Sequence, residues 1–95
     1  MRISTAQRQS ILQATRRSFG EDAKVWLFGS RADDARRGGD LDLYVETNQG
    51  HSLTMELLCR IAIEESLDLH VDLVVNDHQD SKPIFTIAKG SGIRL

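Results

Sequence analysis

The segment Asp40–Glu46, with the sequence DLDLYVE, alternates strictly between polar and apolar residues. A period of two residues is that of an extended strand, so the segment predicts a strand with one apolar and one polar face. The apolar face consists of Leu41, Leu43 and Val45. The polar face consists of Asp40, Asp42, Tyr44 and Glu46. A fold for this chain must therefore bury one side of the strand and accommodate two neighbouring aspartates on the other.

The segment before this strand predicts a helix and a further strand. Ser4 and Gln7 match the S/T-x-x-E/Q capping box, which predicts the start of a helix. The apolar stripe at helical spacing consists of Ile11, Leu12, Thr15 and Phe19. Gly20 marks the expected end of this helix. The bulky run Lys24–Phe28, which stops at Gly29, predicts a strand that is buried on both faces.

The rest of the chain predicts a second helix, a third strand and a short last helix. Ser52 is the expected N-cap of a helix that runs to about Leu67. Its predicted inward face consists of Leu53, Leu57, Leu58, Ile61 and Ala62. Residues 69–75 predict a strand, Pro83 the first turn of a helix, and residues 93–95 a short edge strand. Strands separated by helices predict βαβ connections and a sheet that helices cover.

Composition limits the class of protein. A chain of 95 residues buries roughly 60–65% of its unfolded surface, which predicts one domain over residues 1–95. No apolar run approaches the about 20 residues of a membrane span, and no signal peptide is evident, so we expect a cytoplasmic protein without membrane contact. The single cysteine, Cys59, cannot form an intrachain disulfide. The net charge of −2 argues against direct nucleic-acid coating.

The candidate site begins where the strand Lys24–Phe28 ends. Gly29 and Ser30 there offer backbone N–H groups and a hydroxyl at the carboxyl end of a strand, a usual place for phosphate in α/β folds. Asp40 and Asp42 project from one strand face and repel each other unless a cation lies between them. Such carboxylates suit Mg²⁺, which is typically bound by one or two of them together with phosphate oxygens and water.

Asp72 is a third candidate, because it lies in an otherwise apolar strand. If that strand pairs with the Asp40–Glu46 strand, three carboxylates share one surface and can hold two metal ions about 3.5–4 Å apart. Each aspartate also has a structural interpretation as a solvated or ion-paired residue, and it is the combination with Gly29 and Ser30 that favours a site.

Other polar residues near these positions have weaker assignments. Arg31 directly follows Ser30 and is the best candidate to steady a triphosphate. Arg36 and Arg37 are explained equally well as solvated loop residues. His70 faces the same way as Asp72, and we expect it to be packed or exposed rather than catalytic, while Tyr44 should have a structural role.

Three motifs together resemble a known family. Leu27–Ala32 (LFGSRA), Gly39–Leu43 (GDLDL) and Val71–Val74 (VDLV) resemble the nucleotidyltransferases of the DNA polymerase β superfamily. They are most similar to the minimal nucleotidyltransferase (MNT) proteins, the MntA-type antitoxins of HEPN/MNT toxin-antitoxin systems. The resemblance covers nearly the whole chain and implies the nucleotidyltransferase fold, an α+β fold with a small mixed sheet and flanking helices.

The resemblance also implies roles for individual residues. Asp40, Asp42 and Asp72 correspond to catalytic residues that bind metal, with Mg²⁺, and two ions of it, as the cofactor. Gly29 and Ser30 correspond to nucleotide-binding residues, to which the sequence adds Arg31. The implied reaction transfers AMP from ATP to a hydroxyl and releases pyrophosphate.

In this family the hydroxyl can be a tyrosine of a partner HEPN-domain toxin, which AMP then blocks. We expect such a protein acceptor, because larger superfamily members carry an extra helical domain for their acceptor and 95 residues leave no room for one, so that a partner could supply that surface. A non-catalytic antitoxin that acts by binding, and a small-molecule adenylyltransferase, are the alternatives. The complete aspartate triad argues against the first, and the missing acceptor domain against the second. Nucleic-acid polymerisation is disfavoured, since the sequence shows no basic groove or pattern of stacking aromatics.

Overall fold

The computed structural model describes residues 3–32 and 39–95, apart from the side chain of Ser30. Along this part of the chain, the predicted helices and strands follow one another in the expected order. The elements are α1 (Thr5–Phe19), β1 (Lys24–Phe28), the 3-10 turn η1 (Gly29–Arg31), β2 (Leu41–Glu46), α2 (Leu53–Leu67), β3 (Val71–Asn76), α3 (Pro83–Ser91) and β4 (Ile93–Arg94). The described helices include none with the length and apolar character that a membrane crossing requires.

The helix starts follow the sequence signals. The Ser4 hydroxyl accepts a hydrogen bond from the Gln7 N–H at 3.0 Å, and the Gln7 side chain accepts one from the Ser4 N–H at 2.8 Å. This reciprocal pair is the predicted capping box of α1. Gly20 ends the helix with a φ of 102°, a value that favours glycine. Pro83 lies in the first turn of α3.

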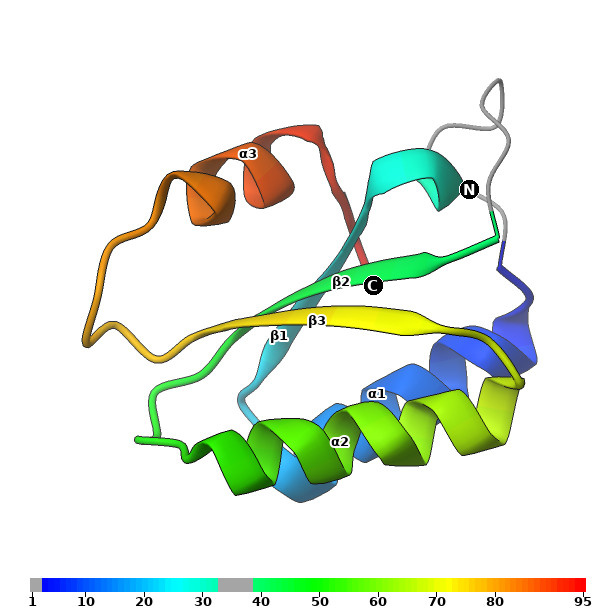
Figure 1. Cartoon of the computed structure of the whole chain (residues 1–95), viewed down its shortest axis with the longest axis horizontal. Coiled ribbons are helices and arrows are strands. Elements are labelled where there is room, and N and C mark those ends of the chain that lie inside the picture. Colours follow the sequence, from blue (N-terminus) through cyan, green and yellow to red (C-terminus); the bar gives the residue numbers. More distant parts are fainter. Residues whose placement is uncertain (1–2, 33–38) are drawn as a thin grey trace.

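The strands form a mixed sheet in the order β3-β2-β1-β4. Strand β1 is antiparallel to both β2 and β4, whereas β2 and β3 are parallel. Helix α2 makes the crossover that parallel neighbours require. Helices α1 and α2 lie on one face of the sheet and α3 on the other (Figure 1). The α+β fold with a small mixed sheet and flanking helices is therefore confirmed.

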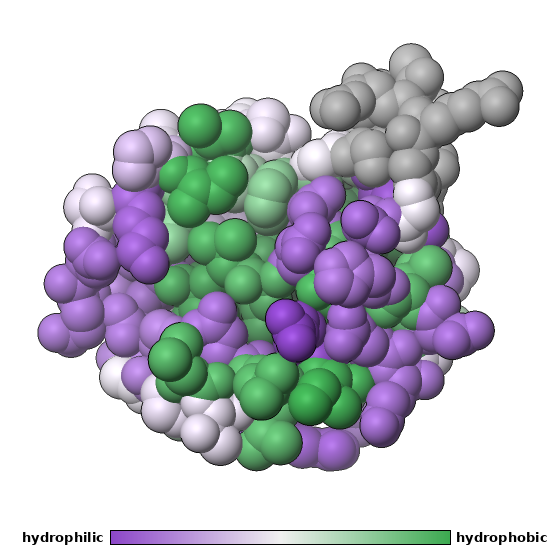
Figure 2. All heavy atoms as spheres, viewed as in Figure 1, coloured by the Kyte–Doolittle hydropathy of each residue, from purple (hydrophilic) through white to green (hydrophobic). Residues whose placement is uncertain are grey.

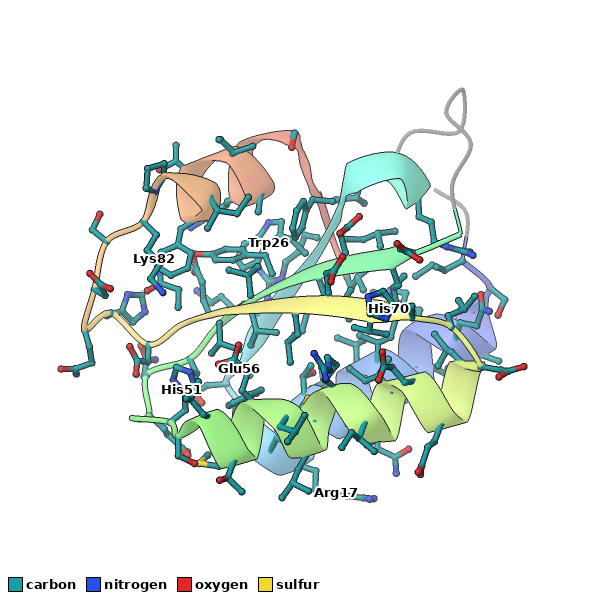
Figure 3. All side chains as sticks on the ribbon, viewed as in Figure 1. Arg17, Trp26, His51, Glu56, His70 and Lys82 are labelled. Atoms are coloured by element: carbon teal, nitrogen blue, oxygen red, sulfur yellow. The ribbon has the colours of Figure 1, made fainter. Side chains whose placement is uncertain are left out.

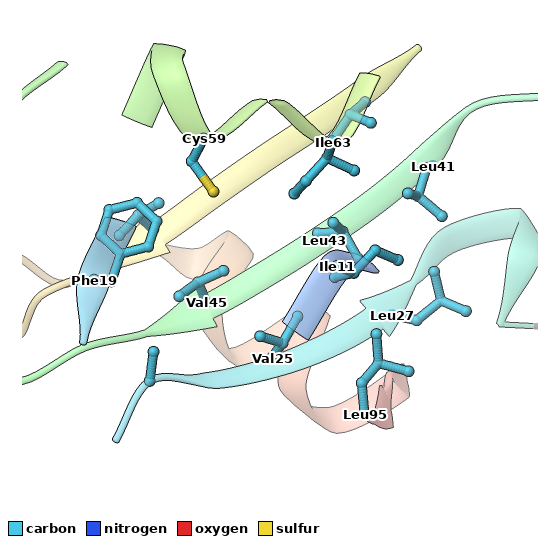
Figure 4. Packing of buried hydrophobic residues seen from close by; sticks show 13 residues of the cluster. Ile11, Phe19, Val25, Leu27, Leu41, Leu43, Val45, Cys59, Ile63 and Leu95 are labelled. Carbon is cyan, nitrogen blue, oxygen red and sulfur yellow. The ribbon is translucent and has the colours of Figure 1, made fainter. Parts of the chain in front are cut away.

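The main core lies between the sheet and helices α1 and α2, where Figure 4 shows the apolar side chains meeting. Its buried members include Ile11, Phe19, Val25, Leu27, Leu41, Leu43, Val45, Cys59, Ile63 and Val71. Cys59 is fully buried in this core, as expected for a packed cysteine, and this burial raises the pKa of its thiol.

The predicted inward face of α2 is wrong. The side chains of Leu53 and Leu58 are 83% and 60% exposed, and the remaining predicted members, Leu57, Ile61 and Ala62, are exposed as well. The residues that face the core are instead Met55, Cys59, Ile63 and Leu67. Both sets repeat every four residues along the helix, so both satisfy the helical period. Docking of α2 against the sheet and α1 selects the second set.

A smaller cluster lies on the opposite face of the sheet, beneath α3. It consists of Trp26, Tyr44, Phe85 and Ala88. The Tyr44 ring centroid lies 5.4 Å from that of Trp26 and 5.7 Å from that of Phe85. Asp40 and Asp72 belong to the same face of the sheet, and both are exposed. Helix α3 thus covers part of this face, while these carboxylates stay open to solvent.

Candidate metal and nucleotide site

The sheet register brings the predicted aspartates together. Asp42 of β2 lies opposite Asp72 of β3 in the parallel pairing. Residues opposite each other in adjacent strands point to the same face, and Asp40, two positions before Asp42, shares that face. The hypothesis that the Asp72 strand pairs with the Asp40–Glu46 strand is therefore confirmed.

Asp40 and Asp72 form a cluster of possible metal ligands with His70. One ligand atom from each of these three side chains lies within 4.8 Å of the other two, and all three residues are exposed. Asp42 lies opposite Asp72 in the strand pairing but is not a member of this cluster. The third member is His70 instead. His70 is exposed, one of the two positions expected for it, and its ring lies close to both aspartates.

Gly29 is the close neighbour of Asp42. A Cβ atom on Gly29 would collide with the Asp42 carboxylate, and the φ of Gly29 is +73°. Both facts require glycine at this position. We expected Gly29 to permit the close approach of a ligand, and in the structure it permits the close approach of the Asp42 side chain. The strand end and the aspartate are therefore in direct contact.

His70 is held from both sides of its ring. Its Nε2 atom lies 3.4 Å from Asp72 Oδ1, and its Nδ1 atom lies 3.3 Å from Glu64 Oε2. The same Glu64 oxygen accepts a hydrogen bond from the Val71 N–H at 2.9 Å. In Figure 3, His70 lies directly before β3, toward the end of the sheet where η1 is found. The sequence signal for this residue is its spacing of two from Asp72 on one strand.

The predicted phosphate-binding residues lie in η1, directly after β1. The guanidinium of Arg31 donates a hydrogen bond from Nη2 to the Gly39 carbonyl at 3.1 Å, which ties this turn to the residue before Asp40. The Ser30 side chain is outside the described atoms. Arg36 and Arg37 fall between residues 32 and 39 and so lie outside the described residues as well. The nucleotide-binding roles of Gly29, Ser30 and Arg31 remain predictions.

The other end of β2 has a different polar arrangement. The Tyr44 hydroxyl donates to Glu46 Oε2 at 2.8 Å and accepts from the Asn76 side-chain amide at 3.0 Å. Lys89 Nζ of α3 lies 3.0 Å from the same Glu46 oxygen. A cavity of about 540 Å³ opens beside Glu46 and Lys89, away from Asp40. Tyr44 is 1% exposed, in accord with its expected structural role.

The mixed sheet, the Gly-Ser turn and the adjacent aspartates are the arrangement that the sequence motifs predicted for a nucleotide-handling domain. The nucleotidyltransferase domain family matches residues 8–93, which spans the chain from α1 to β4. The chain therefore belongs to the nucleotidyltransferase domain family. This match confirms the resemblance at the level of the superfamily, whose general chemistry is the transfer of a nucleotidyl group. A comparison with curated proteins finds no match.

Proposed function

We propose that this protein is a Mg²⁺-dependent nucleotidyltransferase that transfers AMP from ATP to a hydroxyl group of a partner protein. Family membership supports the general reaction. The observation that carries the proposal is that the exposed side chains of Asp40, His70 and Asp72, at the starts of β2 and β3, place possible ligand atoms within 4.8 Å of one another. Asp42 and Gly29 link this grouping to the strand end where phosphate is expected.

The donor set fits a divalent cation. Asp40 and Asp72 supply carboxylate oxygens at exposed positions, which leaves room for water and phosphate oxygens around an ion. These two residues, with Asp42 beside them, would hold the ions. When bound, the ions would offset the negative charge of the triphosphate and polarise the reacting oxygens.

In the proposed reaction the protein positions the two reactants. The backbone of Gly29 and Ser30, with the Arg31 side chain, would orient the triphosphate. The acceptor oxygen then forms a bond to the α-phosphorus, while the bond from the α-phosphorus to the bridging oxygen of the β-phosphate breaks. Pyrophosphate leaves with that electron pair. The hydroxyl proton passes to the Asp72 carboxylate, which acts as the base.

For the acceptor we propose a tyrosine of a HEPN-domain toxin, so that the protein acts as an antitoxin. A row of apolar side chains on α2 supports a protein partner, because a partner would remove these side chains from water. The row consists of Leu53, Leu57, Leu58 and Ile61, and Figure 2 shows hydrophobic atoms gathered over this helix. The same row favours a second candidate, in which binding alone neutralises the toxin.

An AMP-transfer assay tests both candidates. The protein is incubated with Mg²⁺, ATP labelled at the α-phosphate and a lysate of its own host. We expect a labelled protein band with the wild type and none with Asp40→Asn/Asp42→Asn. The matched control, Glu65→Gln/Asp80→Asn, removes the same charge from exposed positions in α2 and in the loop before α3 and should label normally.

The other outcomes separate the alternatives. Label on a small molecule would replace the protein acceptor with a small-molecule one. Partner capture without any label would overturn catalysis and favour neutralisation by contact. Equal labelling by the Asp40→Asn/Asp42→Asn variant would refute the assigned site.

A further inference from the structure

We propose that His70 is a nitrogen ligand of the metal site and makes this site prefer Mn²⁺ to Mg²⁺. The inference rests on the proposed function in one respect, the position of a cation at Asp40 and Asp72. It concerns the binding of the ion alone and needs neither nucleotide nor acceptor.

The first support is the position of the imidazole. Its Nε2 atom faces Asp72 Oδ1 at 3.4 Å, and its ligand atom lies within 4.8 Å of those of both aspartates. Two ligand atoms on opposite sides of one ion, each about 2.1 Å from it, are about 4.2 Å apart. Small rotations of exposed side chains therefore bring all three groups to bonding distance of a single ion.

The second support is the carboxylate on the far side of the ring. Glu64 Oε2 lies 3.3 Å from Nδ1, and it is fixed in place by the Val71 N–H at 2.9 Å. A carboxylate next to Nδ1 favours a proton on that atom, which leaves Nε2, the ring nitrogen nearer Asp72, available as the ligand atom. Histidines that bind metals commonly donate their other ring N–H to a carboxylate in this way.

The local fold explains how Glu64 and His70 meet. Asp68 ends α2 in a left-handed conformation, with φ 54° and ψ 45°. The chain therefore turns sharply between the last turn of α2 and the first residue of β3. Glu64, one turn before the helix end, lies close enough to reach both His70 and the Val71 N–H.

The choice of ion follows from the nature of the donors. Mg²⁺ favours oxygen ligands and water, whereas imidazole suits transition metals. Mn²⁺ shares with Mg²⁺ a preference for carboxylate oxygens and water, but as a transition metal it binds an imidazole nitrogen more strongly than Mg²⁺ does. His70 should therefore strengthen the binding of Mn²⁺ and leave that of Mg²⁺ nearly unchanged.

The structure also allows a competing interpretation. A doubly protonated His70 would form ion pairs with both Glu64 and Asp72, and it would then occupy the place of the metal. Removal of the imidazole would in that case strengthen the binding of both ions, which is the opposite of what a ligand would do.

The test measures ion binding to the full chain in the absence of nucleotide. The loss of the free Mn²⁺ electron paramagnetic resonance signal gives the Mn²⁺ affinity. Displacement of bound Mn²⁺ by added Mg²⁺ then gives the Mg²⁺ affinity. We expect His70→Gln to weaken Mn²⁺ binding by about tenfold or more and Mg²⁺ binding by less than about twofold. The control, His78→Gln, changes an exposed histidine in the loop after β3 and should alter neither affinity.

A pulsed resonance measurement gives a direct readout. Bound Mn²⁺ should show coupling to an imidazole nitrogen in the wild type and in His78→Gln, and no such coupling in His70→Gln. Glu64→Gln should keep the coupling and weaken Mn²⁺ binding by a smaller factor than His70→Gln. Circular dichroism spectra of the variants verify that each is folded.

Three results would overturn the inference: no nitrogen coupling in the wild type, equal weakening of both ions by His70→Gln, or tighter binding by that variant. Asp40→Asn/Asp72→Asn separates this failure from failure of the proposed function. If this variant loses Mn²⁺ and His70→Gln does not, the carboxylate site stands and His70 is no ligand. If the aspartate variant binds Mn²⁺ normally, the metal site of the proposed function is itself wrong.

Discussion

On the polar face of β2, Asp40 and Asp42 lie at one end, and Tyr44 and Glu46 at the other. Both ends carry carboxylates, yet their surroundings differ. Glu46 is mostly buried beneath α3, where the Tyr44 hydroxyl donates to it at 2.8 Å and Lys89 Nζ lies 3.0 Å away. Asp40 is exposed, and its cluster includes a second carboxylate, from β3. The same alternating strand thus produces one internally compensated carboxylate and one that an added cation would stabilise.

The comparison shows that the role of each carboxylate on β2 depends on which element packs against that end of the strand. Helix α3 supplies a lysine to Glu46, so the charge is satisfied within the fold and the residue serves stability. At the other end the register sets Asp42 opposite Asp72, which places like charges next to each other. Like charges directly opposite each other repel, and a cation bound at this end of the strand would reduce that repulsion.

The largest effect is expected from Tyr44→Ala, which removes the ring between Trp26 and Phe85. The ring is 1% exposed, and loss of a buried aromatic side chain costs about 3–5 kcal/mol. Urea unfolding measures the loss, with Tyr44→Phe as a control that keeps the ring and should cost about 1 kcal/mol. A loss below about 1 kcal/mol for Tyr44→Ala would show that this cluster does not anchor α3.

A smaller effect is expected from Glu46→Gln, and it should depend on pH. Partial burial raises the pKa of Glu46, but hydrogen bonds from Tyr44 and Lys89 and the lysine charge together bring it below the ordinary 4.5. A lowered pKa in the folded state stabilises the fold above the ordinary value, and this contribution is lost as the pH falls through the lowered one.

We therefore expect Glu46→Gln to lower the free energy of unfolding by about 1 kcal/mol at pH 7 and by much less at about pH 3. Urea titrations at the two pH values measure the difference. The same loss at both values would mean that the charge of Glu46 has no part in the stabilisation.

The smallest change in stability, of the opposite sign, is expected for Asp40→Asn/Asp42→Asn. Without the like charges the folded state should be as stable as the wild type or slightly more stable, within about 0.5 kcal/mol. Added Mg²⁺ should raise the melting temperature of the wild type and leave that of this variant unchanged. A variant that is clearly less stable would place these aspartates with Glu46 as structural residues.

Much of the fold could be predicted because its signals are local. The capping box at Ser4 and the alternation of Asp40–Glu46 each involve residues close in sequence, and the structure contains both as expected. The adjacency of Asp42 and Asp72 was a hypothesis that depended on which strands pair, a long-range property that a spacing rule does not contain. The family resemblance pointed to the same aspartates.

Two features could not be predicted for physical reasons. Helix α2 carries two apolar series with the same four-residue spacing, one through Leu57 and one through Cys59, and only packing decides between them. The contacts of His70 depend on the left-handed turn at Asp68, which brings Glu64 against it. A single histidine near an aspartate has no distinguishing pattern before that turn is known.

Strand β3 forms one edge of the sheet, and this position bears on self-association. The carbonyls of His70 and Asn76 accept hydrogen bonds from the β2 side, so in a parallel ladder the N–H groups of Val71, Leu73 and Val75 point outward. The first of these groups, the Val71 N–H, donates a hydrogen bond to the Glu64 side chain. Unpaired edges are templates for aggregation, and charged side chains are a common protection. The end of β3 nearest the carboxylates is thus protected against intruding strands, and any strand exchange between molecules would have to begin at the opposite end.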